Sequence, residues 1–116
     1  MSWMDSGLTT QLEHYLHLTS FRVSLVANNI ANIDTPSYHT QDIDFQSEMR
    51  RAEMQAAGSA RPSVRNVPGL LERPDGNNVD MDREALLLAQ LQLQYTMGAQ
   101  LLREQFRRLQ SAINEG

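Results

Sequence analysis

The stretch that decides the fold runs from Phe21 to Phe45 and reads FRVSLVANNIANIDTPSYHTQDIDF. It opens with the apolar spacing of an amphipathic helix and closes with the alternation of an extended segment. Between these parts lie three asparagines, whose short amides compete for backbone hydrogen bonds and therefore favour helix ends. Pro36 then moves Thr35 out of the helical region. We predict that a helix stops near Asn32 and that the chain leaves it through a turn.

The asparagines allow two interpretations. Asn29 and Asn32 are three residues apart, so they share one helix face. In the first interpretation they only end the helix, with Asn32 or Asp34 where the last turn unwinds into a left-handed cap. In the second, an amide bonds across a subunit interface, where a buried asparagine fixes register. Both can hold at once for different asparagines.

Helical periodicity extends from this stretch towards the N-terminus. From about Gly7 to Ile33 apolar residues recur in alternating steps of four and three, the spacing of a coiled-coil stripe. Asp5 or Ser6 is expected to cap the start. The stripe consists of Leu12, Leu16, Val23, Val26, Ile30 and Ile33, with Thr19 as a polar gap.

A second long helix is predicted from about Asp82 to Asn114, with Asp80 or Asp82 as its cap. Gly98 inside it costs ~1 kcal/mol relative to alanine, which predicts close approach of another backbone. The stripe of this helix consists of Leu88, Leu91, Tyr95, Gly98, Leu102, Phe106, Leu109 and Ile113, and Leu86, Leu87 and Leu101 widen it.

The middle of the chain has weaker signals. Tyr38 to Phe45 alternates like an extended segment, and Phe45 to Ala57 has the pattern of a short helix. Gly58 to Asn78 is linker-like, with room for one short strand and a turn at Pro74-Asp75-Gly76.

The predicted fold class is mainly α, with two long terminal helices packing as an antiparallel, coiled-coil-like pair joined by an irregular extended middle segment. A chain of 116 residues suggests a single domain. We divide it into an N-terminal helix and turn (1–36), an extended segment (37–81) and a C-terminal helix (82–116). A lone pair of such helices leaves wide apolar faces in water, which predicts association with other subunits.

The amino-acid composition argues against several kinds of partner and site. The net charge is −4 and all ten basic residues are arginines, so nucleic acid is not the expected partner. There is no cysteine, which removes disulfides and thiolate metal sites. No apolar run is long enough to insert in a membrane. The N-terminal residues lack the basic and apolar regions of a cleavable secretory signal.

Several acidic and histidine pairs are candidates for metal binding. His14 and His17 lie three apart on a helix but lack further ligands, so a solvated face is the preferred interpretation. The pairs Asp42 and Asp44, and Asp80 and Asp82, have oxygen ligands for Mg²⁺ or Ca²⁺, but capping suffices for the second pair. The loop 75–80 is interpreted as a turn. We expect no catalytic site, no cofactor and no metal.

Two separated blocks form a recognisable pattern. The first is Asn29-Ile-Ala-Asn32 followed, after two residues, by Thr35-Pro36-x-Tyr38, with Gln41-Asp-Ile-Asp-Phe45 just after it. The second is Gly76-Asn-Asn-Val-Asp-Met-Asp82 with the Leu/Gln-rich helix that follows. Their order and their coverage of more than half the chain resemble the flagellar rod and hook proteins of bacteria.

This resemblance implies a structural subunit of the flagellar rod that polymerises through its terminal helices, transmits torque and encloses an export channel. It implies other copies, other rod subunits, the export-gate junction protein and the membrane ring as partners. It also implies export by the flagellar type III apparatus without a cleaved signal. The expected subunit interface consists of Leu12, Leu16, Val23, Val26, Asn29, Ile30, Asn32, Leu88, Leu91, Tyr95, Leu102, Phe106 and Leu109. The turn motif consists of Thr35, Pro36, Ser37, Tyr38, Asp42, Asp44 and Phe45.

The chain departs from the family pattern at two positions. Ser37 stands where the family usually has glycine, so we predict a type I turn with negative φ there instead of a type II turn. His39 replaces a common lysine and can titrate near neutral pH.

Two other functions remain open on the sequence. One is a soluble helical adaptor or export chaperone, which would be a folded dimer of fixed stoichiometry. The other is a small metal-dependent hydrolase that uses the aspartate pairs.

Overall fold

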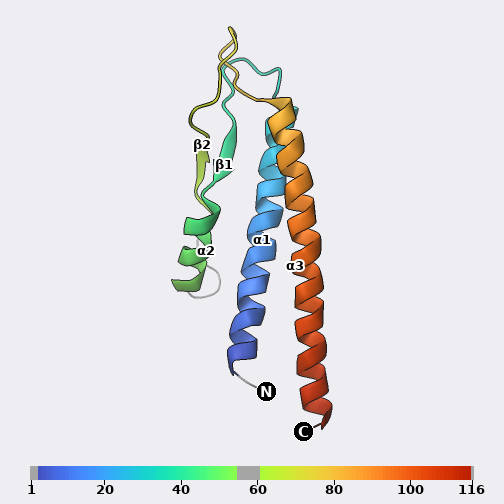
Figure 1. Cartoon of the computed structure of the whole chain (residues 1–116). Helices are drawn as coiled ribbons and strands as arrows, with labels where there is room; N and C mark the ends of the chain where they lie inside the picture. Colours follow the sequence, from blue (N-terminus) through green and yellow to red (C-terminus); the bar gives the residue numbers. More distant parts are fainter. Residues whose placement is uncertain (1–2, 55–60, 116) are drawn as a thin grey trace.

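The computed structural model describes residues 3–54 and 61–115. Two long helices run antiparallel, and Figure 1 shows both chain ends at the same, open end of this hairpin. The predicted fold class is therefore confirmed. The elements in chain order are α1 (Trp3–Ala31), β1 (Gln41–Ile43), α2 (Phe45–Met54), β2 (Val64–Asn66) and α3 (Met81–Glu115).

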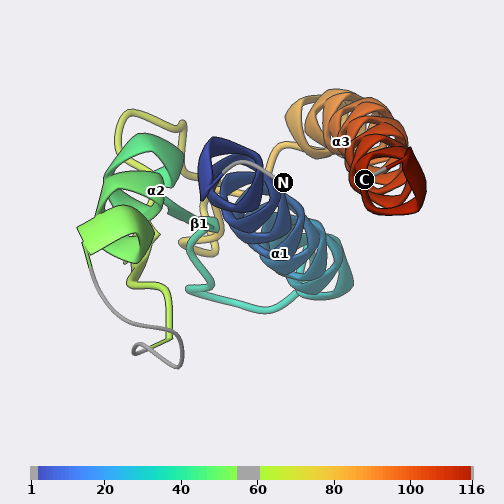
Figure 2. The same ribbon diagram turned by 90° about the horizontal axis from the view of Figure 1, so that it is seen from below.

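Helix α1 lies in the centre of the molecule. Seen along the hairpin in Figure 2, α3 lies on one side of α1, and β1 and α2 lie on the other. The radius of gyration is 17.9 Å, against about 13 Å for a compact chain of this length. The molecule measures 66 × 26 × 18 Å. Such an elongated shape leaves little room for a core.

The buried residues are accordingly more often polar than apolar. The apolar ones among the described residues are Leu18, Val26, Ile43, Val79 and Leu91. The polar ones are Thr19, Asn29, Thr40, Glu48, Asn77, Asn78, Glu84 and Gln105. Since a buried polar group without a partner costs about 1–3 kcal/mol, the fold depends on how these groups are bonded.

The middle segment contacts α1 at several positions along the helix. The Arg22 guanidinium pairs with the Asp42 carboxylate at 2.8 Å. The Tyr15 and Phe45 rings meet edge to face, 5.5 Å apart. Further along, Gln11 Nε2 donates to Glu53 Oε1 at 3.2 Å. These contacts hold β1 and α2 against α1. The sequence predicted the extended segment and the short helix, but not their contacts with α1.

The two strands pair antiparallel, with Gln41 opposite Asn66 and Ile43 opposite Val64. A two-stranded hairpin alone is marginal in water, so its contact with α1 through buried Ile43 supports it. The extended segment after Tyr38 and a strand between residues 58 and 78 were both predicted. Their pairing was not, because three-residue strands carry no register signal of their own.

Helix ends differ from the prediction by a few residues. Helix α1 starts at Trp3, so Asp5 and Ser6 lie within it and do not cap it. It ends at Ala31, two residues before Ile33. Helix α2 ends at Met54, and the predicted continuation to Ala57 and the start of the linker at Gly58 lie outside the described residues.

Gly98 lets the two long helices approach closely. A Cβ placed there would lie 3.0 Å from Leu16 Cδ2 and 3.2 Å from the Tyr15 ring. The predicted approach of another backbone is wrong, because the atoms nearest to Gly98 belong to the Leu16 and Tyr15 side chains of α1. Gly7 in α1 has no atom within 4 Å of such a Cβ.

We expect Gly7→Ala and Gly98→Ala to have opposite effects. Both changes gain helix propensity of up to ~1 kcal/mol, but only the second overpacks the seam, at a cost of about 1–3 kcal/mol. Thermal unfolding followed by circular dichroism should show a raised midpoint for Gly7→Ala and a lowered one for Gly98→Ala. Equal increases would contradict the close approach.

Candidate functional site

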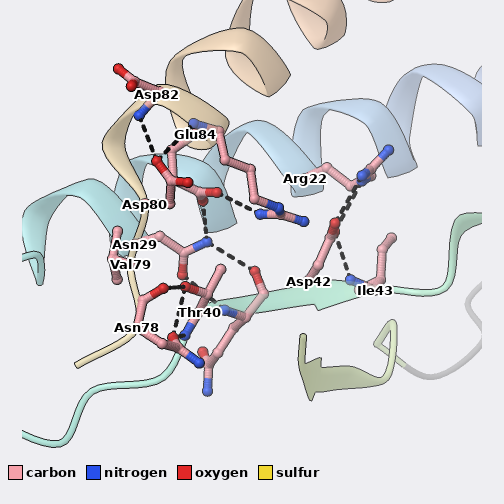
Figure 3. Close-up of polar contacts among 12 residues, drawn as sticks. Arg22, Asn29, Thr40, Asp42, Ile43, Asn78, Val79, Asp80, Asp82 and Glu84 are labelled. Atoms are coloured by element: carbon pink, nitrogen blue, oxygen red, sulfur yellow. Dashed lines mark hydrogen bonds and ion pairs between the residues drawn. The ribbon is translucent and has the colours of Figure 1, made fainter. Parts of the chain in front are cut away.

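The residues of the family-like motif meet at the closed end of the hairpin. There the end of α1, the turn after it, β1 and the start of α3 share a hydrogen-bond network, and Figure 3 draws the part of it around Asn29, Thr40, Asn78 and Glu84. We call this network the polar clasp and define it as Asn29, Tyr38, Thr40, Asn77, Asn78 and Glu84.

Asn29 is the centre of the clasp, and 1% of it is exposed. Its Nδ2 donates to the Gln41 carbonyl at 3.0 Å and to Glu84 Oε1 at 2.5 Å. Its Oδ1 accepts from the Tyr38 hydroxyl at 2.8 Å and from the Gln41 N–H at 3.0 Å. An amide has two N–H donors and two acceptor lone pairs. Every one of them is used inside the chain, so none is left for a bond across a subunit interface.

Glu84 lies in the first turns of α3 and is fully buried. Its second oxygen, Oε2, pairs with Arg83 Nη1 at 2.6 Å. The position near the N-terminus of the helix also favours a carboxylate, because free N–H groups give that end partial positive charge. Asp80 caps the same end by accepting from the N–H of Asp82 at 3.0 Å, one of the two caps predicted.

Side chains of the 73–79 segment donate to backbone carbonyls of the turn that follows α1. Asn77 Nδ2 donates to the carbonyls of Asn32 and Thr35, both at 2.9 Å. Arg73 Nη2 donates to the Ile33 carbonyl, and Nη1 donates to the Val79 carbonyl at 2.7 Å. These side chains satisfy acceptors that a helix end leaves unpaired. A left-handed cap at Asn32 or Asp34 was therefore wrong: among the described non-glycine residues only Ser37 has positive φ.

Asn78 connects the segment before α3 with the residue before β1. Its Oδ1 accepts from the Thr40 N–H at 2.7 Å and from the Thr40 hydroxyl at 3.0 Å. Both residues are buried. Thr40 in turn accepts from the Val67 N–H at 2.9 Å, so the start of α3 is connected through Asn78 to the strand pair.

The predicted conformation of Ser37 is wrong. Its φ is +64°, and the Tyr38 N–H donates to the Thr35 carbonyl at 3.3 Å, the pattern of a type II turn. The reason is tertiary: the Ser37 N–H donates to the Asp75 carbonyl at 2.9 Å. A Cβ at Gly76 would lie 3.3 Å from the Ser37 Cα. The turn after α1 and the turn before α3 thus fit together only in this conformation.

Asp42 lies within β1 and Asp44 follows it, and the two carboxylates bind different partners. Asp42 forms a two-pronged pair with Arg22, whose Nε and Nη2 donate to Oδ1 and Oδ2 at 3.0 and 2.8 Å. Asp44 caps α2 by accepting from the Ser47 N–H at 3.2 Å. Hydrogen bonds from the backbone and side chain of Ser47 lower the pKa of the Asp44 carboxyl. Over residues 3–54 and 61–115, no three His, Asp or Glu residues lie close enough to hold a metal ion.

Tyr38 is a partly buried member of the clasp, and burial raises the pKa of its hydroxyl. The hydrogen bond donated by Asn28 lowers this pKa, and the charge of Glu84 raises it. The hydroxyl therefore stays protonated as the donor to Asn29. His39, the second departure from the family pattern, lies 2.7 Å from Glu72 at the surface.

The expected interface residues differ in their exposure to solvent. Val26 and Leu91 are buried within the chain, whereas Tyr95 and Phe106 are 44% and 50% exposed. The residues of intermediate exposure are Leu12, Leu16, Val23, Ile30, Asn32, Leu88, Leu102 and Leu109. Asn32 bonds within the chain, its Nδ2 donating to the Asn28 carbonyl at 2.8 Å.

The seam of α3 that faces α1 follows a seven-residue step. It consists of Glu84, Leu91, Gly98 and Gln105, all buried. Because two of these residues are polar, apolar periodicity alone missed Glu84 and Gln105. The signal that could have found them is the exact heptad spacing through Leu91 and Gly98. Asn77 and Asn78 lie in the second family-like block, but their partners were not predicted. Arg73 was missed, and nothing local marks it as a partner of the end of α1.

These features define a class of protein: an elongated helical hairpin, closed by a polar clasp, with a long helix that keeps apolar side chains exposed. No protein-family model matches the sequence. Among curated proteins, the flagellar basal body rod protein FlgB of Escherichia coli (strain K12) is 33% identical over 135 aligned residues. The alignment covers 97% of this chain and 96% of the relative.

Similarity extends to distant bacteria. FlgB of Salmonella typhimurium is 32% identical, again over 97% of this chain and 96% of its own. FlgB of Bacillus subtilis is 28% identical over 96% of both chains. The chain belongs to the FlgB family of flagellar basal body rod proteins.

Removing the Asn29 side chain should unfold the closed end. Asn29→Ala leaves Glu84 and the Gln41 backbone without their partners, each at about 1–3 kcal/mol, so a total loss of about 3 kcal/mol or more in unfolding free energy is expected. Urea unfolding measures it. The exposed neighbour Asn28 is the matched control, and Asn28→Ala should cost less than about 1 kcal/mol. Equal losses would show that the clasp does not depend on Asn29.

The Ser37 turn gives a second test. A left-handed conformation costs a non-glycine residue roughly 1–2 kcal/mol, so Ser37→Gly should raise the unfolding free energy by about 0.5–1 kcal/mol after the entropy cost of glycine. Gly76→Ala should lower it, because φ is +84° there and the new Cβ would meet Ser37. Chemical denaturation of both variants checks the pair. A destabilised Ser37→Gly variant would argue against the strained turn.

Proposed function

We propose that this chain is a structural subunit of the proximal rod of the bacterial flagellar basal body. It polymerises through its terminal helices, forms part of the axial shaft that transmits torque, and encloses the export channel. The observation that carries the proposal is the combination of FlgB similarity over 97% of the chain with a hairpin whose long helix leaves large apolar side chains uncovered.

The exposed side chains of α3 support assembly. Leu86, Leu93, Met97 and Leu101 are 54–64% exposed, and Ile113 is 68% exposed. A monomer rarely keeps so many large apolar groups in water along one element, and contiguous exposed apolar surface marks an interaction site. Covering them by other subunits accounts for a chain that has few buried apolar residues of its own.

The subunit contacts are proposed for the exposed members of the expected interface. Tyr95 and Phe106 fit this role best, because aromatic side chains dominate the energy of interfaces. Val26 and Leu91 serve the packing inside the hairpin, and Asn29 serves the clasp. A charged residue at position 26 would therefore unfold the hairpin, so such a variant would not test assembly.

The proposed partners are other copies of this chain, other rod subunits, and the export-gate junction protein and membrane ring at the rod base. The proposed location is the periplasm-spanning rod, reached by flagellar type III export without a cleaved signal. The proposed role is structural and not enzymatic. In the described part of the chain, no helix is long and apolar enough to cross a membrane.

The first experiment is to purify intact basal bodies from the source cells and search them for this chain by mass spectrometry. We expect it at low copy together with other rod proteins, and we expect cells that lack its gene to be non-motile until the gene is restored. A chain found only as a soluble cytoplasmic dimer would overturn the proposal in favour of the adaptor function.

A further inference from the structure

Helix α3 contains a long segment without any charge. From Ala85 to Leu102 the chain has eighteen residues, and none is Asp, Glu, Lys, Arg or His. Charges resume at Glu84 on one side and Arg103 on the other. One face of this segment is used against α1, but a helix that is exposed elsewhere normally carries charge on its outer side.

The uncharged segment carries an apolar row that begins on the side away from α1 and ends at Leu101, which borders a small cavity together with Leu8 and Leu12 of α1. Leu86, Leu93, Met97 and Leu101 are each more than half exposed. Leu93 is two residues, or about 200°, from the buried Leu91. Leu93, Met97 and Leu101 follow one another at steps of four, which builds a continuous ridge on a helix surface. We call these four residues the α3 ridge; it is roughly 22 Å long at 1.5 Å per residue.

A second uncharged surface lies on a flank of the same hairpin. There α1 and α3 border a groove of about 470 Å³. The lining residues are Ser20, Val23, Gln92, Tyr95 and Thr96. None is charged, and the groove lies beside the same segment of α3 as the ridge.

We infer that the α3 ridge of one copy docks in the α1–α3 groove of a second copy. Ridges pack into grooves between helices, and interface cores are depleted of charge, a condition that both surfaces meet. The side of α1 that faces away from α3 is covered within the chain by β1 and α2 (Figure 2). That side of α1 therefore offers no comparable surface to a second copy. The inference rests on the proposed function and names the faces through which copies meet.

The pairing has a consequence for symmetry. Ridge and groove are different surfaces of one chain, so the contact is heterologous, and each copy presents one of each to its neighbours. Heterologous contacts produce rings or helical filaments, whereas a contact of the ridge with itself would produce a closed dimer. The partner chemistry is therefore an uncharged helical groove of this chain, and not an acidic or basic surface.

Cysteine cross-linking in assembled basal bodies tests the inference, since the chain has no cysteine of its own. Leu93→Cys marks the ridge and Ser20→Cys marks the groove. With a short bifunctional maleimide, neither single variant should cross-link above the background set by Leu71→Cys, a loop residue that is 91% exposed. Cells that express both single variants should give dimers, and the double variant should give a ladder of multimers.

Dimers from Leu93→Cys alone would overturn the heterologous contact while leaving the rod function intact. Absence of the chain from basal bodies would instead overturn the proposed function. A ladder no stronger than the Leu71→Cys background, in basal bodies that do contain the chain, would overturn the ridge and groove assignment.

A charge on the ridge gives an independent readout. Leu93→Arg should abolish incorporation into basal bodies and motility, while Leu71→Arg spares both. Both side chains are mostly exposed, so circular dichroism of the purified chains should show unchanged helix content. Normal incorporation of Leu93→Arg would contradict the docking.

Discussion

The structure depends on the side-chain amide of Asn29, whose hydrogen-bond donors and acceptors all have partners within the chain. Asn29 joins positions that are 12 and 55 residues away along the chain, and its two donors and two acceptor sites are all used. Alternatives to this arrangement would leave a buried carboxylate or backbone group unpaired, which costs more than a typical hydrogen bond contributes. The network therefore selects one relative placement of α1, β1 and α3, a specificity that the few buried apolar side chains do not supply.

Much of the fold followed from the sequence because long periodic segments are informative. Both terminal helices, their antiparallel pairing, the turn at Gly76 and the cap at Asp80 were predicted from spacing and residue type. Helix ends shifted by a few residues, as end positions depend on partners that periodicity does not reveal. At the end of α1 those partners are Asn77 and Arg73, more than forty residues later in the chain.

The candidate site was predictable only in part. The motif residues Asn29 and Tyr38 were singled out, but the hydrogen bonds that they form within the chain were not predicted. The burial of Glu84 and its bond to Asn29 were not predicted, because a buried carboxylate at the start of a helix has the same sequence appearance as a solvated one. Ser37 was misjudged for a related reason: local preference favours negative φ, and the contact with Gly76 and Asp75 overrides it. In each case the deciding group is distant in sequence.

The clasp and the outer surface of α3 rely on different forces, and this division bears on how a subunit could carry load. Hydrogen bonds are directional, so the clasp fixes the angle and register at which α3 leaves the closed end. Hydrophobic contact is non-directional and depends on area, so the uncharged outer surface of α3 tolerates small rotations of a neighbour while it stays buried. A subunit built in this way keeps its own geometry rigid and leaves the adjustable contact on the outside. The clasp therefore belongs inside each chain, where strain must not separate the helices, and the apolar ridge suits the proposed contact between chains.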